Sequence, residues 1–407
     1  MSSLRPTPGV CVATLIMGDT SYIAGAMVMA YSVRKHCAGG SVPFHTVCIV
    51  DQNMTDTEAL DCVFDHVVRV EPILAEPMGK RWKRYGAHYD SWIDSCLTKL
   101  HVFNLYKLGY QKVVLVDADV LVVDDHFASV LSAPAPSGIC SDEPNKLDGK
   151  PSHLRPLKTG DKVPAASLRS ALAISYGMRG CLMVLPTGAR HFQQSLHRVA
   201  KEKSEKEGYV GKCGDPKCNA GPDEWLLSVH FKGQWRHLEE AFCCRYWHAK
   251  TRGVTPIAIH FVTDKPWSRT SKKHWPDFDI WLKYAHACLG DVQREDQASR
   301  SGYKMLGAAI EVCEERRLRS APKMRGTPVG RPVRDMSRNK SDGVDSRFES
   351  RKNTEAPLVV SGGLTRSTDT TGPAKGNSAK KTWNRRRRPF YRSAIPRLDE
   401  DKEGTSG

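Results

Sequence analysis

Residues 112–125, KVVLVDADVLVVDD, place two aspartates inside a run of β-branched and other apolar residues. Such a run, preceded here by Gly109, is typical of a strand buried on both faces of a parallel sheet. Because burying an unpaired carboxylate costs several kcal/mol, acids occur there mainly where a cation or hydrogen-bond donors compensate them. Side chains two residues apart on a strand point the same way, so Asp117 and Asp119 can converge on one ligand. The stretch predicts a divalent metal at the carboxyl end of this strand, although the pair alone is also typical of a turn that caps the strand.

Strand-like and helix-like segments alternate over residues 10–130, as in a parallel sheet covered by helices on both faces. Strands are expected at 10–17, 44–51 and 66–73, and helices at 21–37, 55–64 and 91–109. Ligands of such sheets bind beyond the carboxyl ends of the strands. That edge is expected to hold residues 14–19, Asp51 and the two aspartates.

The chain is expected to form one α/β domain over residues 10–290, and its 407 residues are enough for a large core. Residues 141–170 are polar and contain prolines, which predicts a mobile insertion. Residues 291–320 are expected to form a helical connector. Because the sequence has no run of 18 apolar residues and no secretory leader at its start, we expect no membrane span and an intracellular, cytoplasmic location.

The chain has 13 cysteines, which we expect to be mostly reduced core thiols. One group near in sequence has the ligand types of a structural zinc site, since thiolates and an imidazole can complete a tetrahedron. A reduced group without metal is the alternative, because the spacing is irregular. The group comprises Cys213, Cys218, Cys243, Cys244 and His248.

Residues 321–407 have few aromatic residues and many Arg, Ser, Gly and Pro residues, so we expect a disordered tail. The net charge of the chain is +16, and most of it lies toward this end. Four adjacent arginines can contact phosphates of a polyanion or nucleic acid, or serve as a nuclear address, but such runs are commonly just solvated. These are Arg385, Arg386, Arg387 and Arg388.

Five motifs, taken in order, resemble glycosyltransferase family 8, the group of glycogenin and galactinol synthase. They are VATLIMGDTSYIAGAMVMAYSV, CLTKLHVFNLYKLGYQKVVLVDADVLVV, GMRGCLMVLPT, DEWLL and HFVTDKPW. The Asp-x-Asp (DxD) motif alone is a weak signal, but the ordered set over about residues 10–285 is specific. The resemblance implies a GT-A fold, a single Rossmann-like domain that binds a nucleotide sugar with a mostly parallel central sheet.

The resemblance also implies a metal site. Asp117 and Asp119 match the metal-binding aspartates of the family, and His260 matches the third protein ligand. Two carboxylates and one imidazole suit Mn²⁺ better than Mg²⁺, although Mg²⁺ can substitute. Lys265 matches a lysine that contacts the diphosphate, where its ammonium would neutralise charge on the leaving group.

Further positions match the family's donor site. Thr14, Leu15 and Tyr22 fall where the family contacts uridine, and Ala118 lies between the two aspartates. Lys99 matches a lysine near the donor sugar. Two more residues match the glycine of the middle strand and an acid near the reacting sugar, and these are Gly180 and Asp223.

Each residue also has a reading that involves no ligand. His260 could be a core histidine, Lys99 could lie on a solvated helix face, and Asp223 could cap the helix that it begins. Tyr22 and Leu15 could be ordinary core residues.

Three departures from the family pattern bear on the donor sugar and the phosphate loop. Met178-Arg179 precedes Gly180 where the family often has Asn-Ser, Ala220 replaces a common acid, and Thr263 stands where glycine is frequent.

The sequence thus predicts a Mn²⁺-dependent, retaining transferase that moves a hexose from a UDP-sugar, glucose or galactose by family, to a hydroxyl acceptor. Two alternatives stay open. One is a sugar nucleotidyltransferase, although no Gly-rich basic loop follows the first strand. The other is a catalytically degenerate domain that acts as an interaction module through its basic tail.

Overall fold

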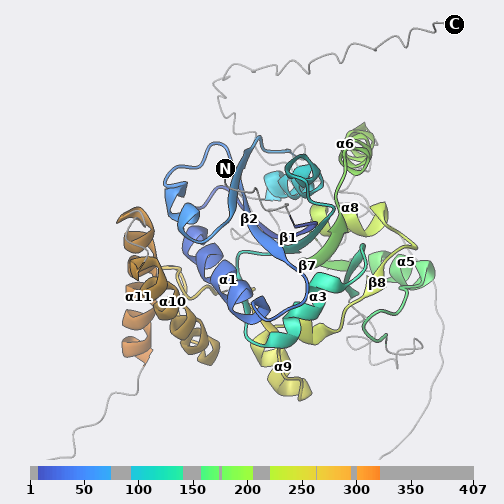
Figure 1. Cartoon of the computed structure of the whole chain (residues 1–407). Coiled ribbons are helices and arrows are strands. Elements are labelled where there is room, and N and C mark those ends of the chain that lie inside the picture. The colour runs from blue at the N-terminus through green and yellow to red at the C-terminus, as the bar shows by residue number, and fades with distance from the viewer. Residues whose placement is uncertain are drawn as a thin grey trace, which may run out of the picture. The chain divides into compact units, whose positions relative to one another are not determined.

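The computed structural model describes residues 8–74, 93–140, 157–173, 177–204, 221–262, 264–294 and 300–320 (Figure 1). The disordered tail predicted for 321–407, with its arginine run, lies outside these residues, and so does most of the insertion predicted at 141–170. Residues 165–170 of that insertion belong to a helix, α5 (Ala165–Ala173).

Among the described residues, seven strands form one sheet in the order β3-β2-β1-β4-β7-β6-β8. The pairs β3-β2, β2-β1 and β1-β4 are parallel, and β7 is antiparallel to both β4 and β6. β8 is parallel to β6, so the sheet is mostly parallel. The bounds are β1 Val10–Ile16, β2 Phe44–Asp51, β3 His66–Val70, β4 Lys112–Val116, β6 Ser137–Cys140, β7 Met178–Pro186 and β8 Arg236–His237.

A second, two-stranded sheet pairs β5 (Val120–Val122) with β9 (Ala258–His260) in antiparallel register. β5 follows β4 directly after the Asp-x-Asp turn. The small sheet therefore brings the chain near residue 260 back to the end of β4.

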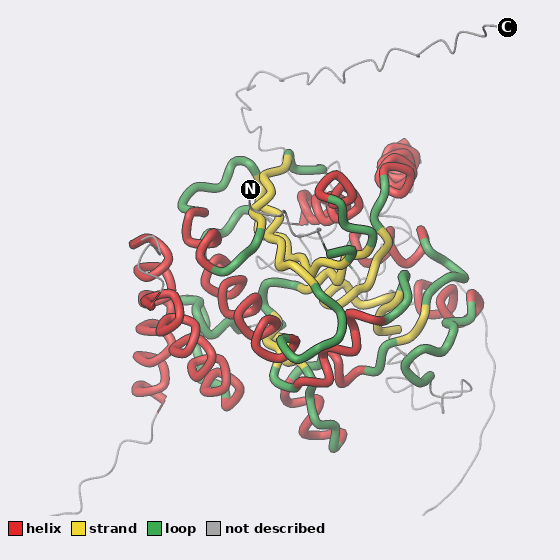
Figure 2. The backbone as a smooth tube through the Cα atoms, viewed as in Figure 1, coloured by secondary structure: helices red, strands yellow, loops and turns green. Residues whose placement is uncertain are grey.

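Helices cover both faces of the large sheet (Figures 1 and 2). On one face α1 (Tyr22–Cys37) packs with α10 (Pro276–Arg294) and α11 (Arg300–Ser320). On the other face lie η3 (Ile93–Leu108), which is a 3-10 helix, α6 (Ala189–Ser204) and α8 (Pro222–His230). Shorter helices are η1 (Thr57–Cys62), η4 (Asp125–Ala128), α3 (Ser129–Ser132), η5 (Glu240–Phe242) and α9 (Tyr246–Arg252).

β1 shows why the strands are apolar along their whole length. Val12 and Ile16 pack into the core on the α1 face, while Cys11 and Ala13 pack into the core on the η3 face. Because side chains alternate along a strand, a strand with helices on both sides needs apolar residues at every position.

The fold class expected from the sequence is confirmed, with the strand and helix order of an α/β domain and a mostly parallel sheet. Several boundaries differ. The strand expected at 66–73 ends at Val70, and the helix expected at 55–64 is a short 3-10 helix, η1. The predicted connector at 291–320 contains the end of α10 and the whole of α11, which packs on α10 and α1 (Figure 1). Among the described residues no helix is both long and apolar enough to cross a membrane.

Candidate active site

The two aspartates form the turn that joins β4 to β5. The Asp117 amide donates to the Cys181 carbonyl of β7 at 3.1 Å, and the Val120 amide donates to the Asp117 carbonyl at 3.1 Å. The antiparallel pairing of β5 with β9 sets Val120 opposite His260. Backbone pairing alone therefore places the imidazole beside the aspartates, although some 140 residues separate them in sequence.

Asp117, Asp119 and His260 each offer a ligand atom within 4.8 Å of the other two. His260 Nε2 lies 3.3 Å from Asp119 Oδ1. Ligand atoms about 2.1 Å from one ion lie at most about 4.2 Å apart, so this spacing fits one ion with small side-chain adjustments. The three residues predicted as metal ligands are thus brought together, and their donor set suits a divalent cation.

Two lysines neutralise these carboxylates. Lys99 Nζ lies 2.9 Å from Asp117 Oδ1 and 2.9 Å from Asp223 Oδ2. Lys265 Nζ donates hydrogen bonds to Asp119 Oδ2 and to the carbonyls of Phe261 and Val262. Lys265 is buried and the Lys99 side chain is only 14% exposed, so the solvated-face reading of Lys99 is wrong.

The pKa values of the two aspartates move apart. Burial raises the pKa of Asp117 to about 6, with Asp119 adding to the rise and Lys99 opposing it. Burial also disfavours the charged form of Asp119, but Lys265 and His260 outweigh it and hold its pKa below the usual range. The site therefore stabilises a negative carboxylate at Asp119 by direct contact with cations.

Asp223 and Glu224 enter the site from the first turn of α8. The helix begins after Gly221, and Asp223 lies one residue inside it with its side chain turned to Lys99, so the alternative reading of Asp223 as the N-cap does not hold. Glu224 takes that role instead, since its Oε2 accepts from the Gly221 amide at 3.1 Å.

Glu224 was missed from the sequence. Its Oε1 accepts from the Gly180 amide at 2.6 Å, and burial, with Asp223 beside it, raises its pKa to about 8. A Cβ on Gly180 would lie 2.8 Å from Glu224 Cγ. Gly180 is thus needed for the close approach of α8 to β7. The sequence signal that could have identified Glu224 was the Gly-containing strand followed by two adjacent acids.

The predicted uridine residues lie at the end of β1 and the start of α1. Thr14 is fully buried, and its Oγ1 has no hydrogen-bond partner among the described residues. β1 pairs with β2 as far as Ile16, but its pairing with β4 stops at Ala13, which leaves the β4 side of residues 14–16 outside the sheet ladder. The Thr14 side chain itself is not exposed.

Tyr22 and Leu15 are partly buried and pack against the core. The Tyr22 ring meets Trp267 edge-on at 5.8 Å, and Lys265 Nζ lies 5.8 Å from the Tyr22 ring centre. Tyr22 therefore borders the lysine of the site.

Gly25 of α1 fixes how closely the helix approaches the Asp-x-Asp turn. A Cβ at this position would lie 2.5 Å from the Trp267 ring and 2.8 Å from the Ala118 carbonyl oxygen. Only a residue without a side chain allows the three segments to meet. Ala118 itself is buried.

Arg316 of α11 is a second residue missed from the sequence. It is buried, and its guanidinium donates to the carbonyls of Pro266 at 3.1 Å, Lys265 at 3.4 Å and Ser268. Ser271 holds the same segment, because its Oγ accepts from the Lys265 amide at 2.9 Å. The supposed connector thus anchors the segment that carries Lys265.

The first of the three departures from the family pattern, Met178-Arg179, has its own partners in the structure. The Met178 amide donates to Ser228 Oγ at 2.8 Å, and Arg179 forms an ion pair of 3.1 Å with Glu240. Ala220 and Thr263 lie outside the described residues.

Of the cysteine group that could be either a zinc site or a set of reduced thiols, Cys213, Cys218 and the side chain of His248 lie outside the described part of the chain. Cys243 and Cys244 are buried neighbours in different surroundings. Cys244 Sγ lies 3.9 Å from the Ala258 carbonyl, whereas Cys243 lies with Cys181 and His260.

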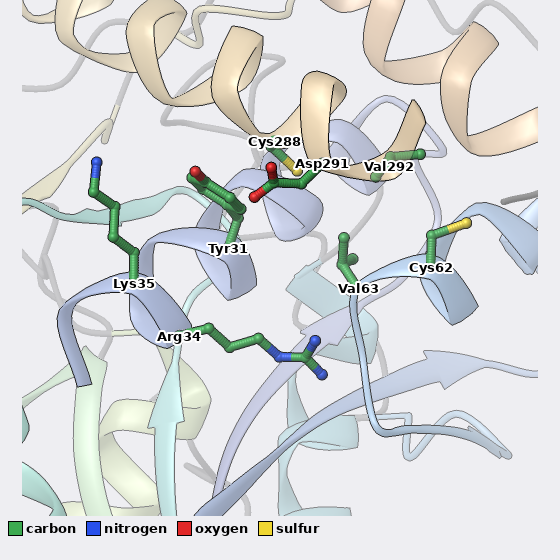
Figure 3. Close-up of a pocket in the computed structure, with 8 residues that line it drawn as sticks. All are labelled: Tyr31, Arg34, Lys35, Cys62, Val63, Cys288, Asp291 and Val292. Atoms are coloured by element: carbon green, nitrogen blue, oxygen red, sulfur yellow. The ribbon is translucent and has the colours of Figure 1, made fainter. Parts of the chain in front are cut away.

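A separate pocket of about 350 Å³ lies between α1, η1 and α10 (Figure 3). It is lined by residues such as Tyr31, Lys35 and Asp291, and none of its lining residues belongs to the predicted site. Tyr31 lies more than two helical turns beyond Tyr22 along α1, so this pocket is not the metal site.

Residues 13–136 match the family model described as glycosyl transferase family 8. This match confirms the resemblance stated from the motifs, and it supports a glycosyltransferase. No curated protein matches the chain.

Solved structures of glycosyltransferases are similar to this one at low identity. The galactosyltransferase LgtC in complex with donor and acceptor sugar analogues has 12% identity and a TM-score of 0.45, covering 68% of this chain and 95% of that chain. The bifunctional glycosyltransferase WbbM has 13% identity and a TM-score of 0.42, covering 69% and 50%. GlyE of Streptococcus pneumoniae has 13% identity and a TM-score of 0.39, covering 74% and 62%. These comparisons give no support to nucleic-acid contact or a nuclear location.

Proposed function

Because residues 13–136 match glycosyl transferase family 8, we propose that this protein is a Mn²⁺-dependent, retaining glycosyltransferase that moves a hexose from a UDP-sugar to a hydroxyl acceptor. The observation that carries this proposal is the convergence of Asp117, Asp119 and His260 with Lys99 and Lys265 at the carboxyl end of β4. This edge is where open α/β sheets bind nucleotides.

Asp117, Asp119 and His260 would hold the ion. When bound, Mn²⁺ or Mg²⁺ supplies positive charge to a diphosphate. The mixed carboxylate and imidazole ligands favour Mn²⁺ over Mg²⁺.

Lys265 stabilises the departing UDP in this proposal. Its ammonium is positioned by bonds to two carbonyls as well as to Asp119, so it needs little reorganisation when charge develops on the leaving phosphate. Arg316 and Ser271 fix the backbone on either side.

Lys99 and Asp223 orient the donor sugar. Their 2.9 Å ion pair, largely buried between η3 and α8, presents fixed polar groups beside the Asp-x-Asp turn. Fixed groups of this kind hold a sugar in a reactive orientation and stabilise positive charge at its anomeric carbon.

Retention follows from a front-face attack. Asp117 and Asp223 are both paired with Lys99, and Glu224 accepts two backbone amides, so these three acids are engaged in the structure and none is offered as a free nucleophile. The bond from the anomeric carbon to the phosphate oxygen breaks, the acceptor oxygen bonds to the same face, and the departing phosphate oxygen takes the acceptor proton.

The donor is glucose or galactose on the family resemblance. Arg179, in place of a smaller polar residue, is held by Glu240 next to Gly180 and changes what a sugar hydroxyl can contact. Nuclear magnetic resonance of the product formed from a UDP-hexose and a simple alcohol or sugar acceptor tests the proposal. An anomeric configuration equal to that of the donor supports it, whereas inversion, or release of pyrophosphate, contradicts it.

A further inference from the structure

Next to the carboxylates lies a second set of ligand-type side chains, made of Cys181, Cys243 and His260. Each of the three offers a ligand atom within 4.8 Å of the other two. The set differs from the one predicted along the sequence, since it takes one cysteine from β7, one from the loop after η5 and the histidine from β9.

Backbone hydrogen bonds hold the three residues in place. The Cys244 amide donates to the Ala258 carbonyl at 3.1 Å, and the His260 amide donates to the Cys244 carbonyl at 2.9 Å. Cys243 is therefore carried on a segment fixed directly to β9. Cys181 lies inside β7, and its carbonyl accepts from the Asp117 amide at 3.1 Å.

The spacing suits a thiophilic ion. With Zn–S distances of about 2.3 Å and Zn–N distances of about 2.0 Å, ligand atoms on one tetrahedral zinc lie roughly 3.3–3.8 Å apart. Side chains now within 4.8 Å of one another reach that geometry by small rotations. Cys181 is 4% exposed and Cys243 is 1% exposed, while 19% of the His260 side chain is accessible and provides the way in.

The geometry points to a sulfur-containing metal site at Cys181, Cys243 and His260 that binds Zn²⁺ or a similar soft dication. Thiolate ligands select soft metals, whereas the neighbouring pair of carboxylates selects harder ones. The two sets share only His260. The sulfur site adds Cys181 and Cys243 to it, whereas the carboxylate site adds Asp117 and Asp119. Its existence does not depend on transferase activity.

Titration of the reduced full-length chain with Cd²⁺ tests the site through the near-ultraviolet charge-transfer absorption of cadmium thiolates. The parent for this test carries Cys213→Ser and Cys218→Ser, which removes the two cysteines of the group seen in the sequence that lie outside the described residues. We expect saturation at one equivalent. Loss of even a hydrogen-bond partner of a ligand typically costs about 10- to 100-fold in affinity, so we expect Cys181→Ser or Cys243→Ser to weaken binding at least tenfold.

The matched control is Cys244→Ser, which removes an adjacent and equally buried thiol that is not in the set. It should leave the titration unchanged. Asp119→Asn should keep the Cd²⁺ absorption while weakening Mn²⁺ binding, and His260→Gln should weaken both. Equal losses in Cys243→Ser and Cys244→Ser, or loss of the absorption in Asp119→Asn, would overturn the site.

X-ray absorption of the unmutated chain with one equivalent of Zn²⁺ avoids any effect of the substitutions on folding. Two sulfur ligands at about 2.3 Å, together with nitrogen or oxygen, agree with the site. A shell of nitrogen and oxygen only, or one of three or four sulfurs, contradicts it.

Discussion

Lys99 lies 2.9 Å from Asp117 and joins the Asp-x-Asp turn to α8 through an equal contact with Asp223. One ammonium thus compensates two largely buried carboxylates. Burial disfavours the charge on Lys99, yet the two acids hold its pKa well above the usual value. The Lys99 ammonium that we propose for the donor site therefore also stabilises the contact between the Asp-x-Asp turn and α8.

Lys99→Met should destabilise the domain, because it leaves Asp117 and Asp223 without their shared cation. Removing one partner of a buried ion pair typically costs about 3–5 kcal/mol in the free energy of unfolding. Urea denaturation measures this loss. Lys107→Met is the matched control, since Lys107 is exposed on the same helix, and equal stability of the two variants would contradict the account.

Gly25→Ala should disturb both stability and UDP binding. The added methyl would overlap the Trp267 ring and the Ala118 carbonyl, and overpacking of this kind costs about 1–3 kcal/mol. Gly307→Ala in α11 is the control, because nothing lies within 4 Å of its Cβ position and alanine favours a helix by up to about 1 kcal/mol. A Gly25→Ala melting temperature at or above that of the unmutated chain would show that the segments do not pack as described.

Arg316→Met should weaken UDP binding in the presence of Mn²⁺ without touching a predicted ligand contact. It frees the carbonyls of Pro266 and Ser268 and loosens the segment that carries Lys265. We expect a loss of about tenfold in affinity by calorimetry, which corresponds to about 1.4 kcal/mol. Arg319→Met, on the exposed side of α11, should bind UDP as the unmutated chain does. Equal affinities of the two variants would argue against an anchoring role for α11.

The stability of the domain should fall as the pH drops below 7, partly because of His230. Burial, with His191 and Arg198 nearby, lowers the pKa of His230 from 6.5 to about 4, and His191 Nδ1 lies 3.3 Å from His230 Nε2. Between these pH values the unfolded chain binds the proton more readily than the folded one, so stability rises with pH and is lost as pH falls through this window. His230→Gln should show a shallower loss between pH 7 and 5 in thermal unfolding. A slope unchanged from that of the unmutated chain would mean that His230 titrates alike in both states.

The sequence predicted those parts of the site that depend on local pattern. Asp117 and Asp119 could be predicted from their place at the end of an apolar strand. His260 was expected beside them only from the family resemblance, and in the structure the β5-β9 pairing brings it there. Arg316 could not be found in this way, because its partners lie some 50 residues earlier and α11 has only the pattern of an ordinary surface helix.

The cysteines show the same limit. Neighbours along the sequence suggested Cys243 with Cys244 and His248, but in three dimensions Cys243 lies with Cys181, about 60 residues away. Adjacent residues in extended backbone point in different directions, so Cys243 and Cys244 need not share a site. Which side chains meet is decided by the packing of β7 against the loop after η5, for which the sequence carries no local signal.

The most direct test of the central claim is release of UDP from a panel of UDP-hexoses with Mn²⁺, with Mg²⁺ and with EDTA. The unmutated chain is compared with Asp117→Ala/Asp119→Ala, and circular dichroism checks that the variant is folded. We predict metal-dependent release of UDP from one donor, greatest with Mn²⁺ and abolished in the folded variant. Release that persists in EDTA or in the variant, or no release together with no calorimetric binding of UDP, would contradict a metal-dependent transferase centred on these two aspartates.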